Sequence, residues 1–313
     1  MTLLRSALVT GGTGFIGSVL VRRLLAEGVA VTCLVRARAR DPGAMASLDG
    51  ARTIPIASSD PVDLATALAG VSADVVFHLA SYGVHQADRD PVQLAEGNVS
   101  LLCNLLHATS SWPMRRFIHS GSCAEYGFSV PAGALIPETQ ALRPASMYGA
   151  AKVVAFFAGQ ALAARLELPF VTLRLFGVFG VHEGPLRLAP YLIQHLSRDQ
   201  PVALTPGEQV RDLLYEDDVV EALMAAADGG ALQSSEVYNV CSGQAIRVRD
   251  FGETVAATLG KPRELLRWGA RPYRPDEAPW QVGDNRRFIG ATSWRPRITI
   301  QDGIARMVAA VRE

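Results

Sequence analysis

Lysine is scarce in this sequence, and net charge and long apolar runs are missing, so several classes of protein are excluded. Lysine occurs twice among the 313 residues, at Lys152 and Lys261. Because the 30 basic and 30 acidic side chains cancel, the charge gives no reason to expect a polyanionic partner such as DNA. No apolar run approaches the roughly 18 residues that a membrane-spanning helix needs. We therefore expect no nucleic acid partner and no membrane partner.

Cysteine and histidine show no pattern that would hold a metal ion. The four cysteines, which include no CxxC pair, are Cys33, Cys103, Cys123 and Cys241. Each lies in an apolar or strand-like stretch typical of small buried residues, and the six histidines form no cluster. We expect free thiols in a reducing compartment and no metal site. Since the first strand leaves no room before it for a signal sequence, we expect a cytoplasmic protein.

The start of the chain has the order of a dinucleotide-binding unit: strand, glycine-rich turn, helix and second strand. The strands are predicted at residues 6–9 and 30–35. In the GxxGxxG turn, Gly11 can reverse the chain, Gly14 can let the backbone approach a pyrophosphate, and Gly17 can let the helix pack closely on the strand. The predicted cofactor-binding residues of this turn are Gly11, Gly12, Thr13, Gly14, Phe15, Ile16 and Gly17.

The residues after the second strand indicate which nicotinamide cofactor is used. An NAD enzyme often has Asp or Glu there to accept a hydrogen bond from the ribose 2′-hydroxyl. This chain has Arg36, followed by Arg38 and Arg40. A guanidinium cannot accept that hydrogen bond, but it can pair with a 2′-phosphate. We therefore favour NADP(H) over NAD(H), with Arg36 as a cofactor-binding residue; three arginines on a solvated loop are the alternative.

Two further apolar runs, residues 74–80 and 116–122, are typical of buried parallel strands. Both end in small or polar residues, and functional groups collect at the carboxyl ends of such strands. Leu79 and Ala80 are therefore predicted to contact the cofactor. Asp60 contacts the adenine or serves as a turn residue before a proline, and both interpretations stay open.

The pair Tyr148 and Lys152 is the strongest chemical signal in the chain. Random placement of seven tyrosines and two lysines in 313 residues would give far fewer than one pair at this spacing. On one helical face the ammonium would favour the phenolate and lower the tyrosine pKa from its usual value of about 10. A carbonyl that accepts hydride develops alkoxide charge, which needs a proton donor and a hydrogen-bond donor. We predict Ser122, at the end of a strand, Tyr148 and Lys152 as the catalytic residues.

Five motifs follow one another along the chain. They are TGGTGFIG at residues 10–17, HLA at residues 78–80, Asn98-Val99, SxxxYG at residues 122–127 and YGAAK at residues 148–152. Together they resemble the extended short-chain dehydrogenase/reductase family, over essentially the whole chain. The resemblance implies that Ser122 hydrogen-bonds the substrate oxygen, that Tyr148 exchanges the proton, and that Lys152 lowers the tyrosine pKa and holds the nicotinamide ribose.

Segments of the second half resemble the nucleotide-sugar epimerase, dehydratase and ketoreductase branch of that family. They are residues 174–180, 207–218 and 271–277. The resemblance implies that Arg211 and Arg274 reach the diphosphate of a nucleoside-diphosphate sugar, and two guanidiniums suit two phosphate charges. Surface ion pairs are the alternative role for both. Gly177 departs from the family, which often has Asn there.

The residues after Ser122 bear on the reaction type. The resemblance implies that 4,6-dehydratases carry adjacent Asp and Glu there as general acid and base. This chain has Cys123 and Ala124, with Glu125 one position late, so we do not expect dehydration; Cys123 and Ser122 are predicted to bind the substrate. With Arg36 favouring NADP(H), we predict NADPH-dependent reduction of a nucleoside-diphosphate 4-keto-6-deoxysugar, in which 4-keto and 6-deoxy follow from the resemblance. An NAD-dependent nucleotide-sugar 4-epimerase is the alternative, and a non-catalytic NADP(H)-binding regulator is the second alternative.

These patterns predict an α/β fold, a Rossmann doubly wound parallel sheet of about seven strands with a smaller interleaved C-terminal substrate lobe. The NAD(P)-binding domain is expected at residues 1–176 and 213–240, and the nucleotide-sugar-binding lobe at residues 177–212 and 241–313. The resemblance also implies a homodimer that pairs through helices. Candidate interface residues are Val153, Phe156 and Phe157, which packing in the core explains equally well.

Overall fold

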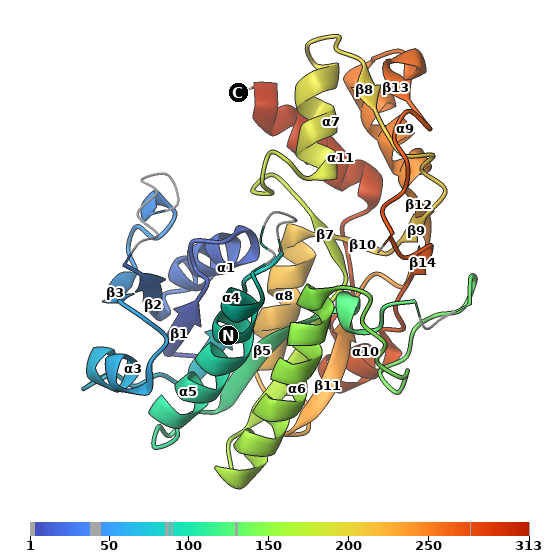
Figure 1. Cartoon of the computed structure of the whole chain (residues 1–313). Coiled ribbons are helices and arrows are strands. Elements are labelled where there is room, and N and C mark those ends of the chain that lie inside the picture. The colour runs from blue at the N-terminus through green and yellow to red at the C-terminus, as the bar shows by residue number, and fades with distance from the viewer. Residues whose placement is uncertain are drawn as a thin grey trace.

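Seven parallel strands form the central sheet of the protein, in the order β11-β6-β5-β4-β1-β2-β3 (Figure 1). The computed structural model describes residues 4–37, 45–84, 88, 90–128, 131–275 and 277–312. The strand bounds are β1 Ser6–Thr10, β2 Ala30–Arg36, β3 Arg52–Ile56, β4 Val75–His78, β5 Arg116–Ser122, β6 Phe170–Leu175 and β11 Glu236–Val240. The predicted Rossmann sheet is therefore confirmed.

The strand order reverses beside β1. The chain runs outward from β1 to β2 and β3, then returns to place β4 on the other side of β1. In open parallel sheets a ligand cleft forms at the carboxyl ends of the strands where the order reverses. The glycine-rich turn after β1 and the residues after β4 both lie at this edge.

The central strands are buried on both faces, which explains their unbroken apolar sequences. In β1, Ala7 and Val9 belong to one hydrophobic core, whereas Leu8 belongs to the core on the opposite face. In β4, Phe77 and Val76 divide in the same way. This alternation follows from the two-residue period of a strand.

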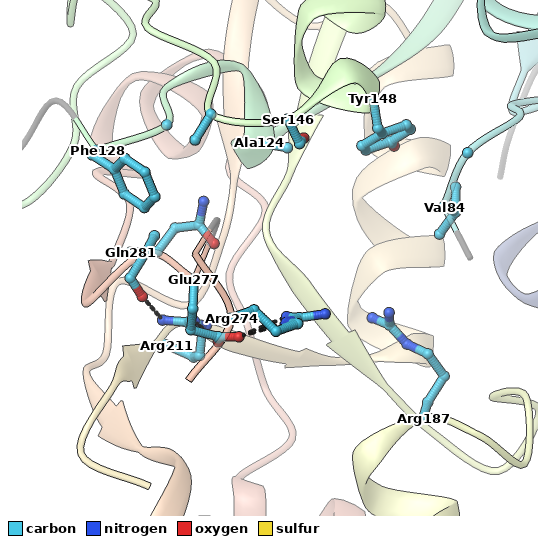
Figure 2. Close-up of a pocket in the computed structure, with 14 residues that line it drawn as sticks. Val84, Ala124, Phe128, Ser146, Tyr148, Arg187, Arg211, Arg274, Glu277 and Gln281 are labelled. Carbon is cyan, nitrogen blue, oxygen red and sulfur yellow. Dashed lines mark hydrogen bonds and ion pairs between the residues drawn. The ribbon is translucent and has the colours of Figure 1, made fainter. Parts of the chain in front are cut away.

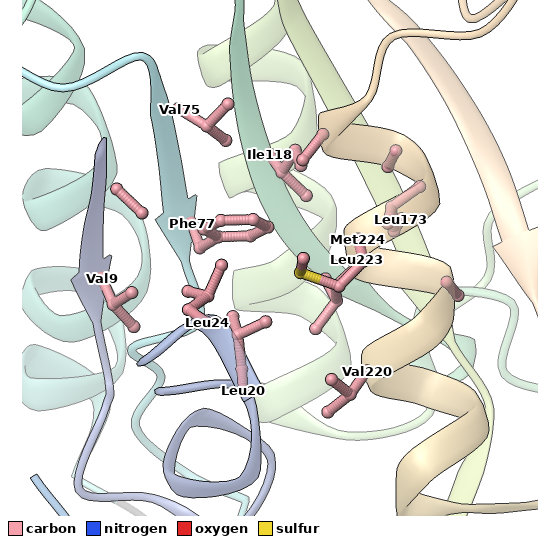
Figure 3. Close-up of a cluster of buried hydrophobic side chains, with 14 of the residues drawn as sticks. Val9, Leu20, Leu24, Val75, Phe77, Ile118, Leu173, Val220, Leu223 and Met224 are labelled. Atoms are coloured by element: carbon pink, nitrogen blue, oxygen red, sulfur yellow. The ribbon is translucent and has the colours of Figure 1, made fainter. Parts of the chain in front are cut away.

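Helices cover both faces of the sheet. Residues of α1 and α8 pack with Val9 and Phe77 in the first core (Figure 3), and residues of α3, α5 and α6 pack in the second. The helix bounds are α1 Phe15–Ala26, α3 Pro61–Ala67, α4 Pro91–Ala95, α5 Leu101–Ala108, α6 Met147–Arg165 and α8 Glu216–Ala227, with a π-helical turn, η1, at Glu96–Ser100. Because helices cover both faces, the edge at the carboxyl ends of the strands is where a binding site can form.

Helix α6 differs from expectation in one respect. Its 19 residues are, by length and mean hydropathy, apolar enough to cross a bilayer, although no such run was expected. However, α6 carries the buried Lys152 and packs against α5 and η1. A core helix of this kind passes the same test, so the length and apolarity are weak evidence for a membrane span. The absence of a membrane partner stays a prediction.

A smaller lobe lies beside the carboxyl edge of the sheet (Figure 1). Its helices α7, α9 and α11 share a third core, in which Leu192, Phe251 and Ile304 are buried. Short strands pair around it: β7 with β10, β8 with β13, and β9 with both β12 and β14. The bounds are β7 Gly177–Phe179, α7 Leu188–Leu196, β8 Val202–Ala203, β9 Val210–Arg211, β10 Leu213–Tyr215, β12 Ile246–Arg247, α9 Val248–Leu259, the 3-10 turn η3 Arg263–Leu265, β13 Leu266–Arg267, β14 Trp280–Gln281, α10 Arg286–Thr292 and α11 Ile300–Arg312.

The two lobes exchange short segments. Strand β10, which the expected division places in the first domain, pairs with β7 and not with the seven-stranded sheet. Conversely, Phe288 and Trp294, from the segment expected in the lobe, are buried in the first core of the sheet. The domain limits at 176 and 240 stay a prediction, and the interleaving itself is visible in the packing.

Candidate active site

The glycine-rich turn is packed tightly between β1, β4 and α1. Gly11 has a φ of +75°, and a Cβ there would lie 2.6 Å from the Ala80 backbone nitrogen. A Cβ on Gly17 would lie 2.0 Å from the Gly11 carbonyl oxygen. Both positions therefore require glycine, for backbone conformation and for close packing of the helix on the turn.

The N-terminus of α1 has no side-chain cap. Gly14 is its N-cap residue and has no side chain to satisfy the first backbone N–H groups. Thr13, Phe15 and Ile16 around it are partly exposed. The first N–H groups of a helix and the helix dipole attract a phosphate. The residues present thus fit a dinucleotide pyrophosphate, and their binding role stays a prediction.

The other predicted cofactor residues lie along the same edge. Leu79 and Ala80 follow β4 directly, and their backbone N–H groups donate to the carbonyl and hydroxyl oxygens of Thr10, at 3.1 and 3.3 Å. Arg36 is exposed at the carboxyl end of β2; Arg38 and Arg40 lie outside the described residues. The Asp60 carboxylate accepts a hydrogen bond of 2.8 Å from the Val62 N–H and caps α3. Of its two open interpretations, the structure shows the turn role, and an adenine contact stays a prediction.

The three residues predicted to be catalytic meet above the sheet. Ser122 ends β5, and Tyr148 and Lys152 lie in the first turns of α6, which begins after its N-cap residue Ser146. The Tyr148 hydroxyl lies close enough to the hydroxyls of Ser122 and Ser81 for both to act on its pKa. The Lys152 ammonium is 2% exposed and donates to the Ser120 carbonyl oxygen at 2.9 Å. A proton donor, a hydrogen-bond donor and a cation therefore share one small volume.

The electrostatics of the pair differ from the sequence-based expectation. Burial raises the pKa of Tyr148 to about 12, and its hydrogen bonds with Ser122 and Ser81 act in the opposite direction. Burial lowers the pKa of Lys152 to about 8, against the pull of the Glu125 carboxylate. The expected lowering of the tyrosine pKa is therefore not what the structure shows: desolvation outweighs it, and the Lys152 ammonium is directed to a backbone carbonyl.

Ser81 owes its position to a buried asparagine that sequence reasoning did not assign to the site. Asn98, 1% exposed in η1, accepts a hydrogen bond of 2.7 Å from the Ser81 hydroxyl. Its amide donates to the Tyr82 and Leu94 carbonyl oxygens, both at 2.9 Å. The amide is thereby oriented, and it holds Ser81 against Tyr148. Asn98 belongs to one of the quoted motifs, but nothing in that motif indicates this contact.

A fully buried ion pair lies beneath Ser122. Glu125 is in the 3-10 turn η2 (Cys123–Glu125); one carboxylate oxygen accepts from the Ser122 N–H at 2.7 Å and the other from the Arg174 Nε at 2.6 Å. Neither side chain is more than 1% exposed. The Arg174 guanidinium also stacks on the rings of Tyr126 and Phe156. Glu125 is therefore occupied in holding the end of β5 and is not placed to act on a substrate.

A cavity of about 280 Å³ opens beside Tyr148, between the sheet edge and the smaller lobe (Figure 2). Tyr148, Ala124 and Val84 lie on one side, and arginines lie on the other. The lining residues are Gly83, Val84, Ala124, Gly127, Phe128, Ala145, Ser146, Tyr148, Arg187, Arg211, Arg274, Glu277, Ala278 and Gln281. Three guanidiniums and one carboxylate suit an anionic substrate that reaches from the arginines to Tyr148.

The predicted substrate residues are distributed unevenly around this cavity. Arg211 and Arg274 line the cavity. Each pairs with one oxygen of the same carboxylate, Glu277. Ser122 and Cys123 do not line it. Burial raises the pKa of the Cys123 thiol to about 12, and its carbonyl oxygen accepts from the Gln281 amide at 3.1 Å. Substrate binding by the two arginines stays a prediction. In the segment that follows β5, Ala124 is the residue that lines the cavity next to Ser122.

Sequence reasoning missed Arg187, and it did not assign a role to Glu277 or Gln281. Arg187 lies outside every quoted motif, and only the packing of the loop before α7 brings it to the cavity. Gly177, the departure from the family pattern, has a steric reason. A Cβ there would lie 2.6 Å from the Leu213 side chain and 2.7 Å from the Asp212 carbonyl oxygen, so the close pairing of β7 with β10 favours glycine.

We predict that Glu125→Gln lowers the free energy of unfolding by about 3–5 kcal/mol, because it leaves the buried Arg174 guanidinium without its counter-charge. Urea denaturation followed by circular dichroism measures the change. The matched control is Glu221→Gln, which removes an exposed partner of Arg23 and should cost about 1 kcal/mol or less. A Glu125→Gln protein as stable as the control would contradict this account of the site.

The chain matches one family model, described as the NAD dependent epimerase/dehydratase family, over residues 7–241. A curated relative, dTDP-6-deoxy-L-talose 4-dehydrogenase (NAD(P)(+)) of Kitasatospora kifunensis, is 29% identical, with 96% of this chain and 94% of the relative covered.

Two solved structures are similar over nearly the whole chain. UDP-glucose 4-epimerase of Thermotoga maritima, solved with UDP-glucose, has a TM-score of 0.88 at 25% identity and covers 98% of both chains. The dTDP-glucose 4,6-dehydratase DesIV of Streptomyces venezuelae, solved with NAD, has a TM-score of 0.86 at 25% identity and covers 98% of this chain and 97% of its own.

Proposed function

Because the chain belongs to the NAD-dependent epimerase/dehydratase family, we propose that it reduces a nucleoside-diphosphate 4-keto-6-deoxysugar to the alcohol with NADPH. The family consists of NAD(P)-dependent enzymes that modify nucleotide sugars, and the finer reaction is our proposal. The observation that carries it is the position of Tyr148, which lies beside Ser122 and lines an arginine-rich cavity. The relative that acts at the 4-position of dTDP-6-deoxy-L-talose supports the substrate class.

In the proposed reaction, each residue of the site has one task. NADPH, when bound, supplies the hydride. Ser122 donates a hydrogen bond to the 4-keto oxygen, and Tyr148 delivers its hydroxyl proton as alkoxide charge develops there. A pKa of about 12 keeps Tyr148 protonated, which suits a proton donor. Lys152 is the cation that stabilises the phenolate left behind.

The residues next to Ser122 argue against water elimination. Dehydration needs a general acid and a general base, and Cys123 and Ala124 supply neither, since burial raises the pKa of the Cys123 thiol to about 12. The nearest carboxylate, Glu125, is held by Arg174. A net oxidation or reduction, or an epimerisation through a keto intermediate, needs no such pair.

The choice of cofactor rests on Arg36. Its exposed position at the end of β2 suits pairing with a 2′-phosphate, and we propose NADP(H) over NAD(H). The DesIV structure contains NAD, and the talose dehydrogenase is named for both cofactors, so NAD(P) use is common to these proteins. An NAD-dependent 4-epimerase is the second candidate, which the likeness to the Thermotoga epimerase favours.

The catalytic assignment predicts that Tyr148→Phe lowers kcat/KM for a nucleoside-diphosphate 4-keto-6-deoxysugar at least about 100-fold, because the proton donor is lost. Oxidation of NADPH, followed by absorbance, measures the rate. Tyr191→Phe, in α7 outside the cavity, is the control and should keep the wild-type rate. Turnover within a few-fold of wild type in Tyr148→Phe would sink the assignment, and wild-type protein without any turnover would favour the non-catalytic NADP(H)-binding regulator.

Cofactor retention separates reductase from epimerase. A reductase exchanges its cofactor each turnover, so we expect purified protein without firmly held NAD and with a preference for NADPH. Arg36→Ala should weaken NADPH binding about 10-fold or more and leave NADH binding unchanged, because it removes a charge-assisted contact. Fluorescence titration measures both, with Arg22→Ala, exposed on α1, as the control. Tightly held NAD, identified by mass, would instead support the epimerase.

A homodimer in the cytoplasm is also proposed. Of the candidate interface residues on α6, Phe156 is 6% exposed and packs in the core, whereas Phe157 is 53% exposed. The neighbouring Val154 is also 53% exposed. An exposed apolar stripe on α6 suits a helix-paired dimer. We expect light scattering to give twice the mass of the chain, and a monomer would exclude this arrangement.

A further inference from the structure

Arg187 lines the cavity together with Arg211 and Arg274, but it comes from a different part of the smaller lobe. It is the N-cap residue of α7, at the end of the loop that follows β7, and its side chain is 53% exposed. Figure 2 shows the guanidiniums of Arg187 and Arg274 pointing toward one another across the cavity. Two cations directed at the same space repel one another unless an anion lies between them. Their arrangement therefore fits a diphosphate.

Each cavity arginine is paired with a carboxylate, but the two carboxylates differ. Glu277 uses both of its oxygens, one for Arg211 and one for Arg274. Glu183 uses one oxygen, which accepts from the Arg187 Nε at 3.2 Å. Among the described residues, its other oxygen is buried and has no hydrogen-bond partner. Of the three arginines that line the cavity, Arg187 is therefore the one held least firmly by its carboxylate.

Glu183 is poorly placed to remain charged without Arg187. Its side chain is 6% exposed, and burial raises its pKa to about 7; Arg187 lowers that pKa, and the charge of Glu216 raises it. Glu216, at the start of α8, is itself occupied by the backbone and ring nitrogens of His182, at 3.1 and 2.7 Å. In the part of the chain that the structure describes, the charged groups that act on Glu183 are Arg187 and Glu216, and His182 is linked to them through its hydrogen bonds with Glu216.

We infer that Arg187 moves from Glu183 to the diphosphate of the bound nucleotide sugar, and that Glu183 takes up one proton from solvent in exchange. The inference rests on the proposed substrate class. A buried carboxylate that loses its counter-charge is neutralised rather than left ionised. Glu183 is thus a positioning residue, which acts on the substrate through Arg187.

The exchange fixes the direction of a pH effect. Protonated Glu183 does not compete for Arg187, so nucleotide-sugar binding is strongest below pH 7, where this group already holds its proton. Above pH 7 the proton must be taken up, and the affinity falls by up to about tenfold per pH unit. If Glu183 only stabilised the fold, nucleotide-sugar binding would not be accompanied by proton uptake at this residue.

Isothermal titration calorimetry tests this with UDP-glucose, dTDP-glucose and CDP-glucose, whose diphosphate diesters do not titrate between pH 6 and 8. Heats in two buffers of different ionisation enthalpy give the protons taken up per nucleotide bound. For wild-type protein we expect about half a proton at pH 7 and close to one at pH 8, with roughly tenfold weaker binding at pH 8 than at pH 6.

Two variants and one control sharpen the result. Glu183→Gln keeps the shape of the side chain without its charge, so it should take up no proton and bind with the same affinity at pH 6 and pH 8. Arg187→Gln should bind about tenfold more weakly at pH 6 and also take up no proton. Glu208→Gln, an exposed partner of Arg249, should behave as wild type.

The outcomes separate this inference from the function on which it rests. Binding without proton uptake in wild type, or unchanged uptake in Glu183→Gln, would overturn the exchange and leave the substrate class intact. No binding of any of the three nucleotide sugars would overturn the substrate class, and the inference with it.

Discussion

The buried ion pair of Glu125 and Arg174 is the interaction on which the rest of the site depends. It joins the end of β5 to the neighbouring strand β6 at 2.6 Å, and the same carboxylate holds the Ser122 backbone N–H. The guanidinium stacks between Tyr126 and Phe156 of α6. The ion pair thereby connects the end of β5, strand β6 and helix α6, and this connection places Ser122 beside Tyr148. Burial raises the pKa of the Glu125 carboxyl, and the charge of Arg174 and the hydrogen bond from the Ser122 N–H act in the opposite direction.

Around that pair the site concentrates positive charge, which is buried at Lys152 and half-exposed at Arg187 and Arg274. Lys152 is buried behind Tyr148, and arginines occupy the far side of the cavity (Figure 2). The buried cation acts in a low local dielectric, whereas the half-exposed Arg187 and Arg274 are partly screened by solvent. The carboxylates of Glu277 and Glu183 pair with the arginines and offset the repulsion between the guanidiniums.

Much of this arrangement follows from local sequence. Periodicity and the glycine turn predicted the parallel sheet and its carboxyl edge, and the spacing of Tyr148 and Lys152 predicted one face of a helix, all as the structure has them. The pKa of Tyr148 was predicted in the wrong direction, because desolvation depends on how deeply the fold buries the ring. Arg187 was missed because no motif contains it, and the pairing of β10 with β7 is too short to leave a pattern.

The sequence by itself determined the sheet, the glycine-rich turn and the choice of candidate catalytic residues, because strand period, glycine sterics and helical spacing act between near neighbours. The tertiary structure decided which charges meet. Glu125 lies 49 positions from Arg174, and Glu277 lies 66 from Arg211. Pairing over such separations depends on chain packing, and so do burial and the pKa values that burial sets.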